Sequence, residues 1–383
     1  MSKMTDFDLI LKGGHIIDPD QKINSVMDLA FKDGKIAALE NEIPISENVL
    51  VKDLSGSFIT PGLIDMHTHV YWGGTSIGVQ PDDYSSKSAV STLVDTGSVG
   101  PGNFYGFKSH IIDKTRARIL IFLHISHAGI FAFSDKIMVG ESEDMRLMDP
   151  KTAIEVAKAN KDVIVGIKVR LGRWTSGNNG LAPLEVALEV AEASGLPLMV
   201  HIDEPPPSYK EIVASLRKRD ILTHCFRGSP NSPLTISGDI EPEILLARSR
   251  GVYFDIGHGS MSFSFDTAKK MLRSGFYPDT ISSDVHCLCI NGPAFDLVTT
   301  LSKFYSLGMP LIEVVRASTQ NAAEILAKPD LGSLKVGTVG DASILKIKDG
   351  SFEYEDGEKN KLDGDKKILA DGLVINGKWI IPN

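Results

Sequence analysis

Short apolar runs alternate with helical stretches through the middle of the chain, between about residues 59 and 328. Amphipathic segments with a 3.6-residue period, such as 150–159 and 184–193, separate several of these runs. The alternation predicts a parallel sheet, and eight repeats over about 250 residues suit a closed (β/α)8 barrel. An open doubly wound sheet is the alternative, but no G-x-G-x-x-G follows the first strand. The eight predicted strands are Leu63–His67, Ser91–Thr96, Arg118–His124, Val163–Val169, Leu196–His201, Ile221–His224, Val252–Ile256 and Thr280–Asp284.

The two chain ends share a different pattern. Residues 7–58 form short alternating or apolar runs, broken by turn signals such as Gly13-Gly14 and Asp33-Gly34, and the tail from Ala342 onward is similar. Neither end buries much surface alone, and chain ends often lie close together. We therefore predict an α/β protein in which residues 59–328 form a (β/α)8 TIM barrel. Residues 1–58 plus 329–383 would form a small β-sandwich domain built from both chain ends.

Composition narrows the class of protein. The net charge is −9 and no basic block occurs, which argues against nucleic-acid binding. No apolar run approaches the roughly 18–20 residues of a membrane span, and the first residues lack the apolar core of a signal peptide. Three cysteines do not make a disulfide framework. We expect a cytoplasmic protein that acts on a small molecule, without nucleic-acid or membrane partners.

Metal-ligand side chains end several predicted strands. His67 and His69 alternate, so both point to one side of the first strand end, although an isolated H-x-H is often incidental. Lys168 lies within Val163–Val169, whose valines and Ile167 would form the opposite face, so Lys168 should point into the barrel. A buried ammonium is costly and its pKa falls. The neutral amine could add CO2 as a metal-bridging carbamate; pairing with a nearby carboxylate is the alternative.

Three more strands end in candidate ligands. His201, His224 and Asp284 each close an apolar run. Taken singly, each histidine could be a hydrogen-bonded core residue, and Asp284 could cap the next helix. Taken together, five strand ends supply metal-ligand side chains, and a barrel gathers the carboxyl ends of its strands at one mouth. The joint pattern predicts a metal centre.

Four longer sequence segments resemble those of a known protein family. The runs Asp8–Asp18, Ile59–His69, Thr319–Ala323 and Gly337–Ser343 resemble the amidohydrolase superfamily over nearly the whole chain, in its binuclear-metal subtype with a carboxylated lysine. That subtype includes dihydroorotases, hydantoinases and aminoacylases. The resemblance implies two divalent metal ions, with zinc as the first expectation and manganese or iron as alternatives. Asp284 would be the catalytic residue that orients a metal-bridging hydroxide, takes its proton and protonates the leaving group. The implied ligands are His67, His69, Asp284 and the Lys168 carbamate for one ion, and His201, His224 and the same carbamate for the other.

Loops after the strands should supply substrate specificity. Arginine suits a carboxylate because its planar fork donates two parallel hydrogen bonds, although each arginine could equally be a solvated surface charge. The substrate-binding candidates are Tyr71, His127, Arg173, Arg227 and His286. Further candidates at the same mouth are Trp72, Tyr84, His124, Arg170, His258 and Cys287.

Departures from known subtypes refine the expected reaction. Dihydroorotase-like members usually carry an arginine just after H-x-H, where this chain has Val70 and Tyr71. Glu204, three residues after His201, keeps a nucleobase deaminase open, but deaminases of that type lack the bridging lysine. The run Gly166–Arg170 resembles hydrolases of acylated amino or hydroxy acids, which are often named dihydroorotase automatically.

We therefore expect a metal-dependent hydrolase that cleaves an amide or ester bond of a small carboxylate-bearing substrate. That substrate would be an N-acyl amino acid or an O-acyl hydroxy acid. A cyclic amidohydrolase is the alternative, a deaminase follows, and a non-enzymatic scaffold is disfavoured because all six ligand positions are kept. Family analogy suggests a homo-oligomer.

Overall fold

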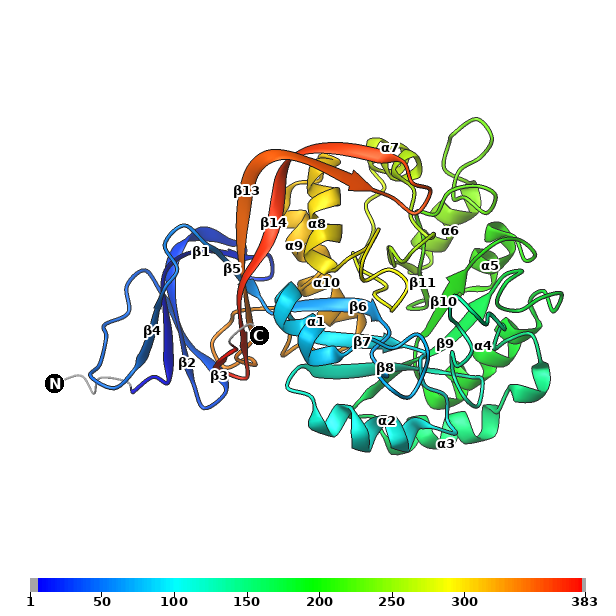
Figure 1. The fold of residues 1–383 in the computed structure, drawn as a ribbon, viewed down its shortest axis with the longest axis horizontal. Helices are drawn as coiled ribbons and strands as arrows, with labels where there is room; N and C mark the ends of the chain where they lie inside the picture. The colour runs from blue at the N-terminus through cyan, green and yellow to red at the C-terminus, as the bar shows by residue number, and fades with distance from the viewer. Residues whose placement is uncertain (1–5, 381–383) are drawn as a thin grey trace.

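The structure, a computed structural model, describes residues 6–380. The predicted domain bounds extend beyond these residues at both ends, since residues 1–5 and 381–383 lie outside them, and the division into two domains stays a prediction. Seven parallel strands form one sheet in the order β12-β11-β10-β9-β8-β7-β6 (Figure 1). They are β6 (Leu63–Thr68), β7 (Val90–Thr96), β8 (Arg118–His124), β9 (Ile164–Leu171), β10 (Leu198–Ile202), β11 (Ile221–Leu222) and β12 (Tyr253–Phe254).

An eighth parallel segment joins the two edges of this sheet. Thr280 forms a parallel bridge with Asp255, just after β12, and Val285 forms one with Thr68 of β6. Backbone hydrogen bonds run along both sides of the segment, from the amide of His258 to the carbonyl of Ser282 (3.1 Å) and from that of His69 to the carbonyl of Val285 (3.0 Å). The predicted eighth strand is therefore present as an irregular extended segment. The predicted fold class, an α/β barrel with a second unit made from both chain ends, is confirmed.

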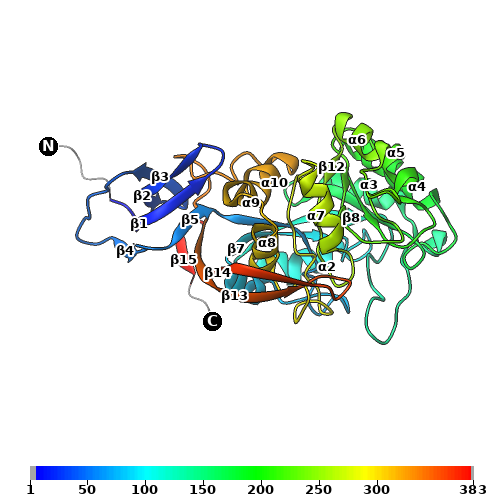
Figure 2. The same cartoon turned by 90° about the horizontal axis from the view of Figure 1, so that it is seen from above.

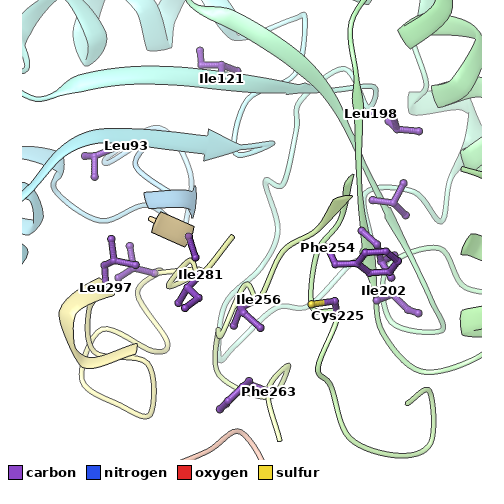
Figure 3. Close-up of a cluster of buried hydrophobic side chains, with 14 of the residues drawn as sticks. Leu93, Ile121, Leu198, Ile202, Cys225, Phe254, Ile256, Phe263, Ile281 and Leu297 are labelled. Carbon is purple, nitrogen blue, oxygen red and sulfur yellow. The ribbon is translucent and has the colours of Figure 1, made fainter. Parts of the chain in front are cut away.

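Helices surround the barrel and cover its base. Side chains on the outer face of the sheet, among them Leu93, Ile121 and Leu198, pack against the helices in one large apolar core (Figure 3). Inside the barrel, Met66 and Phe122 belong to a second apolar cluster that also includes residues of α10. The helices are α1 (Pro81–Ser88), α2 (Phe104–His110), α3 (Pro150–Ala159), α4 (Ala182–Ser194), α5 (Tyr209–Ser215), α6 (Pro242–Ser249), α7 (Phe265–Arg273), α8 (Leu297–Ser306), α9 (Leu311–Ala317) and α10 (Gln320–Ile325), with short 3-10 turns η1 (Ile112–Lys114) and η2 (Met145–Leu147).

Local sequence signals set several helix ends. The Asp149 side chain accepts a hydrogen bond from the amide of Thr152 and so caps α3, which has proline at its first position. α5 begins with a capping box between Ser208 and Glu211. α4 ends at Gly195, whose φ of 72° is the left-handed conformation that favours glycine. Of these helices, α3 and α4 match the helical segments that the sequence pattern predicts.

The prediction that Val163, Val165, Ile167 and Val169 share one face of β9 is wrong at Val165. Val165 belongs to the interior cluster with Phe122, whereas Ile167 and Val169 belong to the outer core. The β8–β9 register shifts at this point, because Ile121 pairs with Ile164 and Phe122 pairs with Gly166. This bulge adds one residue, after which alternation resumes.

The chain ends together form a mixed sheet in the order β15-β14-β13-β5-β1-β2-β3, with β4 pairing with β1. Its long hairpin, β13 and β14, arches from this sheet across the barrel, as Figures 1 and 2 show. No helix in residues 6–380 is long and apolar enough to cross a membrane. The strands are β1 (Leu9–Asp18), β2 (Ile23–Lys32), β3 (Lys35–Glu40), β4 (Leu50–Asp53), β5 (Phe58–Pro61), β13 (Ala342–Glu355), β14 (Lys361–Ile375) and β15 (Lys378–Ile380).

Candidate active site

A carboxylate from the closing segment meets two histidines from β6. His67 is the last residue but one of β6, His69 directly follows the strand, and Nε2 of each lies 3.2 Å from Oδ1 of Asp284. All three residues are buried. Asp284 has a φ of 49°, a left-handed conformation that costs a non-glycine residue free energy and is common at functional sites. The strand ends therefore bring two nitrogens and a carboxylate together in the barrel mouth.

Two more histidines complete this cluster from the neighbouring strands. Nδ1 of His201, on β10, lies 2.7 Å from Nε2 of His224, which follows β11. The same Nε2 lies 4.0 Å from Oδ2 of Asp284. One ligand atom from each of His67, His224 and Asp284 lies within 4.8 Å of the others. These three residues form a buried His/His/Asp group that can hold a metal ion.

The outer ring nitrogens of three histidines are held by hydrogen bonds. Nδ1 of His67 lies 2.8 Å from the Thr223 hydroxyl, and Nδ1 of His69 lies 2.9 Å from that of Ser98. Nδ1 of His224 donates to the carbonyl of Gly257 at 2.6 Å. Such bonds favour the tautomer with the hydrogen on Nδ1, which leaves the lone pair of Nε2 for a metal ion.

Burial sets the protonation of the cluster. It lowers the pKa of His69 to about 3 and those of His67, His201 and His224 well below their ordinary range. It also raises the pKa of Asp284 to about 6. Neutral imidazole is the form that binds metals, so these histidines need lose no proton to act as ligands at neutral pH.

Lys168 lies on β9 with its side chain fully buried. Its Nζ has no hydrogen-bond partner among residues 6–380, and burial lowers its pKa to about 7. An unpartnered buried amine costs free energy unless another group satisfies it. A carbamate formed on Nζ would turn this group into an anionic oxygen donor. The nitrogen and oxygen donors present therefore fit a divalent metal centre with a carboxylated lysine.

A cavity of about 470 Å³ opens onto this cluster, and His69, His201 and Asp284 line it. Of the substrate-binding candidates, Arg227 and His286 also line it. The other three candidates are not among its lining residues. The Tyr71 ring stacks on Phe107 with centroids 4.6 Å apart, His127 is exposed and bonds Asp149, and the Arg173 side chain is exposed.

Other charged groups complete the cavity wall. Arg170, two residues after Lys168 on β9, lines it, as do Asp203 and Glu204 just after β10. Glu358 reaches it from the tip of the β13–β14 hairpin. Arg170 shares the face of Lys168 through strand alternation, which is a signal present in the sequence. Glu358 has no such signal, because its position depends on how the hairpin crosses the barrel.

The family model described as the amidohydrolase family matches residues 58–380, which is most of the chain. The chain belongs to the amidohydrolase family. This amidohydrolase is 36% identical over 328 residues to a deacetylase of Brucella anthropi, covering 86% of this chain and 81% of the relative. It is 33% identical over 346 residues to a deacetylase of Enterococcus faecalis, covering 89% and 90% of the two chains.

Solved structures agree on the fold of this amidohydrolase. A crystal structure described as a dihydroorotase superposes with a TM-score of 0.89 at 32% identity and covers 97% of this chain and 98% of its own. Another, described as an adenine deaminase, gives 0.90 at 30% identity and covers 98% and 100%. This chain is thus a hydrolase of the amidohydrolase family, and its relatives carry several activity names.

Proposed function

We propose that this protein is a metal-dependent hydrolase that cleaves an amide or ester bond in a small, carboxylate-bearing substrate such as an N-acyl amino acid or O-acyl hydroxy acid. The observation that carries the proposal is the unpartnered Nζ of Lys168 in the middle of a buried His and Asp cluster. Relatives that are named deacetylases at 33–36% identity support hydrolysis of an acyl group.

Two divalent ions, with zinc as the first choice, would be held by six side chains. When bound, such a pair lowers the pKa of a water molecule between the ions and polarises the scissile carbonyl. Each residue is assigned by the strand end from which it projects. The assigned ligands are His67, His69, Asp284 and carboxylated Lys168 for one ion, and His201, His224 and the same lysine for the other.

Asp284 is the residue that moves the proton. Its carboxylate lies at the centre of the cluster, and it also lines the cavity where the substrate would lie. It accepts a proton from the water molecule whose oxygen attacks the carbonyl carbon. It then donates that proton to the departing nitrogen or oxygen as the C–N or C–O bond breaks, which balances the hydrolysis. The cavity volume, about 470 Å³, suits a small substrate.

Arg227 supports an anionic substrate. It is 8% exposed, Nη1 donates to the carbonyl of Ile202 at 2.6 Å, and Nε is buried without a hydrogen-bond partner among the described residues. A buried guanidinium donor in a cavity wall favours a ligand that supplies the missing acceptor. An oxygen atom of the substrate is such an acceptor.

Deamination of a nucleobase is the second candidate. Glu204 lines the cavity, three residues after His201, and the likeness to the adenine deaminase structure favours the same reaction class. Lys168 separates the two candidates, because a hydrolase with a carboxylated lysine needs its amine and a mononuclear deaminase does not.

The deciding experiment is a substrate screen on protein loaded with Zn²⁺ or Mn²⁺. The screen would measure acetate release from N-acetyl amino acids and O-acetyl hydroxy acids. It would also measure acid release from cyclic ureides and ammonia release from adenine. Acetate release that disappears on chelation and returns with metal supports the proposal. Ammonia release from adenine alone would replace it with the deaminase.

Lys168→Ala tests the carbamate directly. We expect activity to fall by about 1000-fold or more and bound metal to drop below two ions per chain, because the bridging oxygen ligand is lost. Acetate or propionate at high concentration should restore part of the activity by supplying a carboxylate. The control is Lys161→Ala, an exposed lysine in the loop before β9. Two tightly bound ions in the Lys168→Ala protein would rule out the carbamate.

A further inference from the structure

Arg170 is a second arginine in the cavity wall. It follows Lys168 by two residues on β9, and the β9–β10 register places it directly opposite His201. Neighbouring strands lie about 4.8 Å apart, so its backbone is one strand spacing from a candidate ligand. The side chain is only 5% exposed and lines the cavity.

Glu141 holds one edge of the Arg170 guanidinium. Nε donates to Oε1 of Glu141 at 2.7 Å, and Nη2 donates to Oε2 at 2.8 Å. The remaining nitrogen, Nη1, has no hydrogen-bond partner within residues 6–380. The guanidinium also lies over the Phe133 ring, 4.8 Å from its centroid. Because Glu141 holds two of its nitrogens and Phe133 covers one face of its plane, the guanidinium keeps its free N–H groups pointing in one direction.

A buried histidine lies beside Glu141. Nδ1 of His124 accepts a hydrogen bond from the amide of Ser126 at 2.9 Å, so its Nε2 carries the hydrogen. That Nε2 lies 3.1 Å from Oε1 of Glu141. Glu141 is 6% exposed and comes from the long connection between β8 and α3. Arg170 and Glu141 thus form a buried hydrogen-bonded pair at the cavity, with the His124 ring next to the carboxylate.

The two hydrogen bonds between Arg170 and Glu141 exceed what charge balance requires. A single contact with Glu141 would neutralise Arg170, yet the bidentate geometry also fixes its rotation. Since a pre-organised donor loses little conformational entropy on binding, the arrangement favours recognition of a planar acceptor beside the ligand cluster. Arg227 has no bidentate partner, because its Nη1 donates to the carbonyl of Ile202 and its Nε has no hydrogen-bond partner among the described residues.

We propose that Arg170 binds the substrate carboxylate next to the scissile bond, and that Glu141 is the positioning residue that aims it. The inference rests on the proposed hydrolase function and deepens it, because it assigns selectivity for an acid over its amide to one guanidinium.

The test compares the N-acetyl amino acid that is best hydrolysed in the screen with its C-terminal amide. For Arg170→Met we expect kcat/KM for the acid to fall about 100-fold, mainly through KM, because a buried charged contact is lost. For the amide it should change less than about threefold. Glu141→Gln should raise KM for the acid about tenfold while kcat stays within about threefold. Metal content should stay at the wild-type value in every variant.

Two further variants keep the test decisive. Arg170→Met leaves the Glu141 carboxylate buried without its partner and could unfold the protein, so the double variant Arg170→Met/Glu141→Gln removes both charges. Arg146→Met is the control, because Arg146 is an exposed arginine on the same connection, bonded to Asp144. Binding of the free amino acid product, measured by calorimetry, should weaken at least tenfold in the double variant and stay unchanged in the control.

The outcomes separate the two ideas. Wild-type preference for the acid that persists in the double variant overturns the role of Arg170 while the proposed function stands. Equal kcat/KM values of the wild-type protein for the acid and for its amide would also overturn the role of Arg170. If neither compound nor any other acylated acid is hydrolysed, the proposed function fails and the inference fails with it.

Discussion

Three candidate ligand histidines in the barrel mouth, His67, His69 and His224, are held by a hydrogen bond at Nδ1, and the bond of His67 continues through the Thr223 hydroxyl. The Thr223 hydroxyl lies 2.8 Å from Nδ1 of His67 and donates to Oδ2 of Asp255 at 2.7 Å. Thr223→Val keeps the shape and removes both bonds. We expect metal affinity to fall about 10–100-fold, the usual range for such partners. Competition with a chromophoric chelator measures it, and affinity equal to wild type would contradict the role assigned to this hydroxyl.

At the residue scale, the sequence could predict side chains whose placement follows from strand alternation. His67 and His69 lie together because alternate residues share a side, and the same rule extends from Lys168 to Arg170. Glu141 could not be found this way. It lies in the connection between β8 and α3, and such a loop has no periodic pattern that predicts which part of the barrel it contacts.

At the element scale, the bulge in β9 determines where Lys168 points. Val165 is the extra residue, and Gly166 after it pairs with Phe122. A Cβ at Gly166 would lie 2.1 Å from Cε1 of Phe122, a fully buried ring inside the barrel. Gly166→Ala should therefore destabilise the protein by about 1–3 kcal/mol, the cost of overpacking a core. Urea unfolding measures it. The companion variant Gly166→Ala/Phe122→Leu makes room and should recover part of the loss; no recovery would show that the Phe122 ring is not what requires glycine here.

Predicted and observed strands agree closely where apolar runs are long. β8 has the predicted bounds, Arg118–His124, and β6 and β7 differ by one residue at one end. The last three are short or irregular because they pair through only a few bridges, as at Asp255 and Thr280. The bulge at Val165 could not be predicted, since it depends on the Phe122 ring of the neighbouring strand.

Helix α8 carries a second buried lysine, outside the ligand cluster. Nζ of Lys303 donates to the carbonyls of Pro293 (2.7 Å) and Glu355 (2.8 Å) and lies 2.7 Å from Nε2 of His258. Burial lowers its pKa from 10.5 to about 7. Between these values the unfolded chain binds more protons than the folded one, so stability should rise with pH across this range and fall as pH drops toward 7.

Lys303→Met is expected to flatten that part of the stability profile, because no proton is then released on folding at this position. The free energy of unfolding in urea, compared at pH 7 and pH 9.5, measures the change. The exposed Lys161→Ala variant serves again as the control and should keep the wild-type slope. An unchanged slope in Lys303→Met would assign the pH dependence to other groups.

At the scale of the whole molecule, the β13–β14 hairpin makes the terminal sheet part of the active-site wall. Its tip is anchored by Asp356, which is fully buried and accepts hydrogen bonds from the amides of Phe265 (2.8 Å) and Asn360 (2.8 Å). The amide of Gly357 donates to the carbonyl of Phe263 at 2.9 Å. Because Gly357 and Glu358 line the cavity, the anchored tip fixes part of the cavity wall.

Asp356→Ala should therefore affect stability and substrate binding together. It leaves buried amides without acceptors, which costs about 1–3 kcal/mol for each group, so Tm should fall by several degrees. KM should rise as the tip loosens, while metal content stays unchanged because no ligand lies on the hairpin. Asp363→Ala, an exposed aspartate on β14, is the control. A lower Tm with wild-type KM would mean that the hairpin stabilises the barrel without shaping its cavity, and a wild-type Tm would mean that Asp356 does not anchor the hairpin tip.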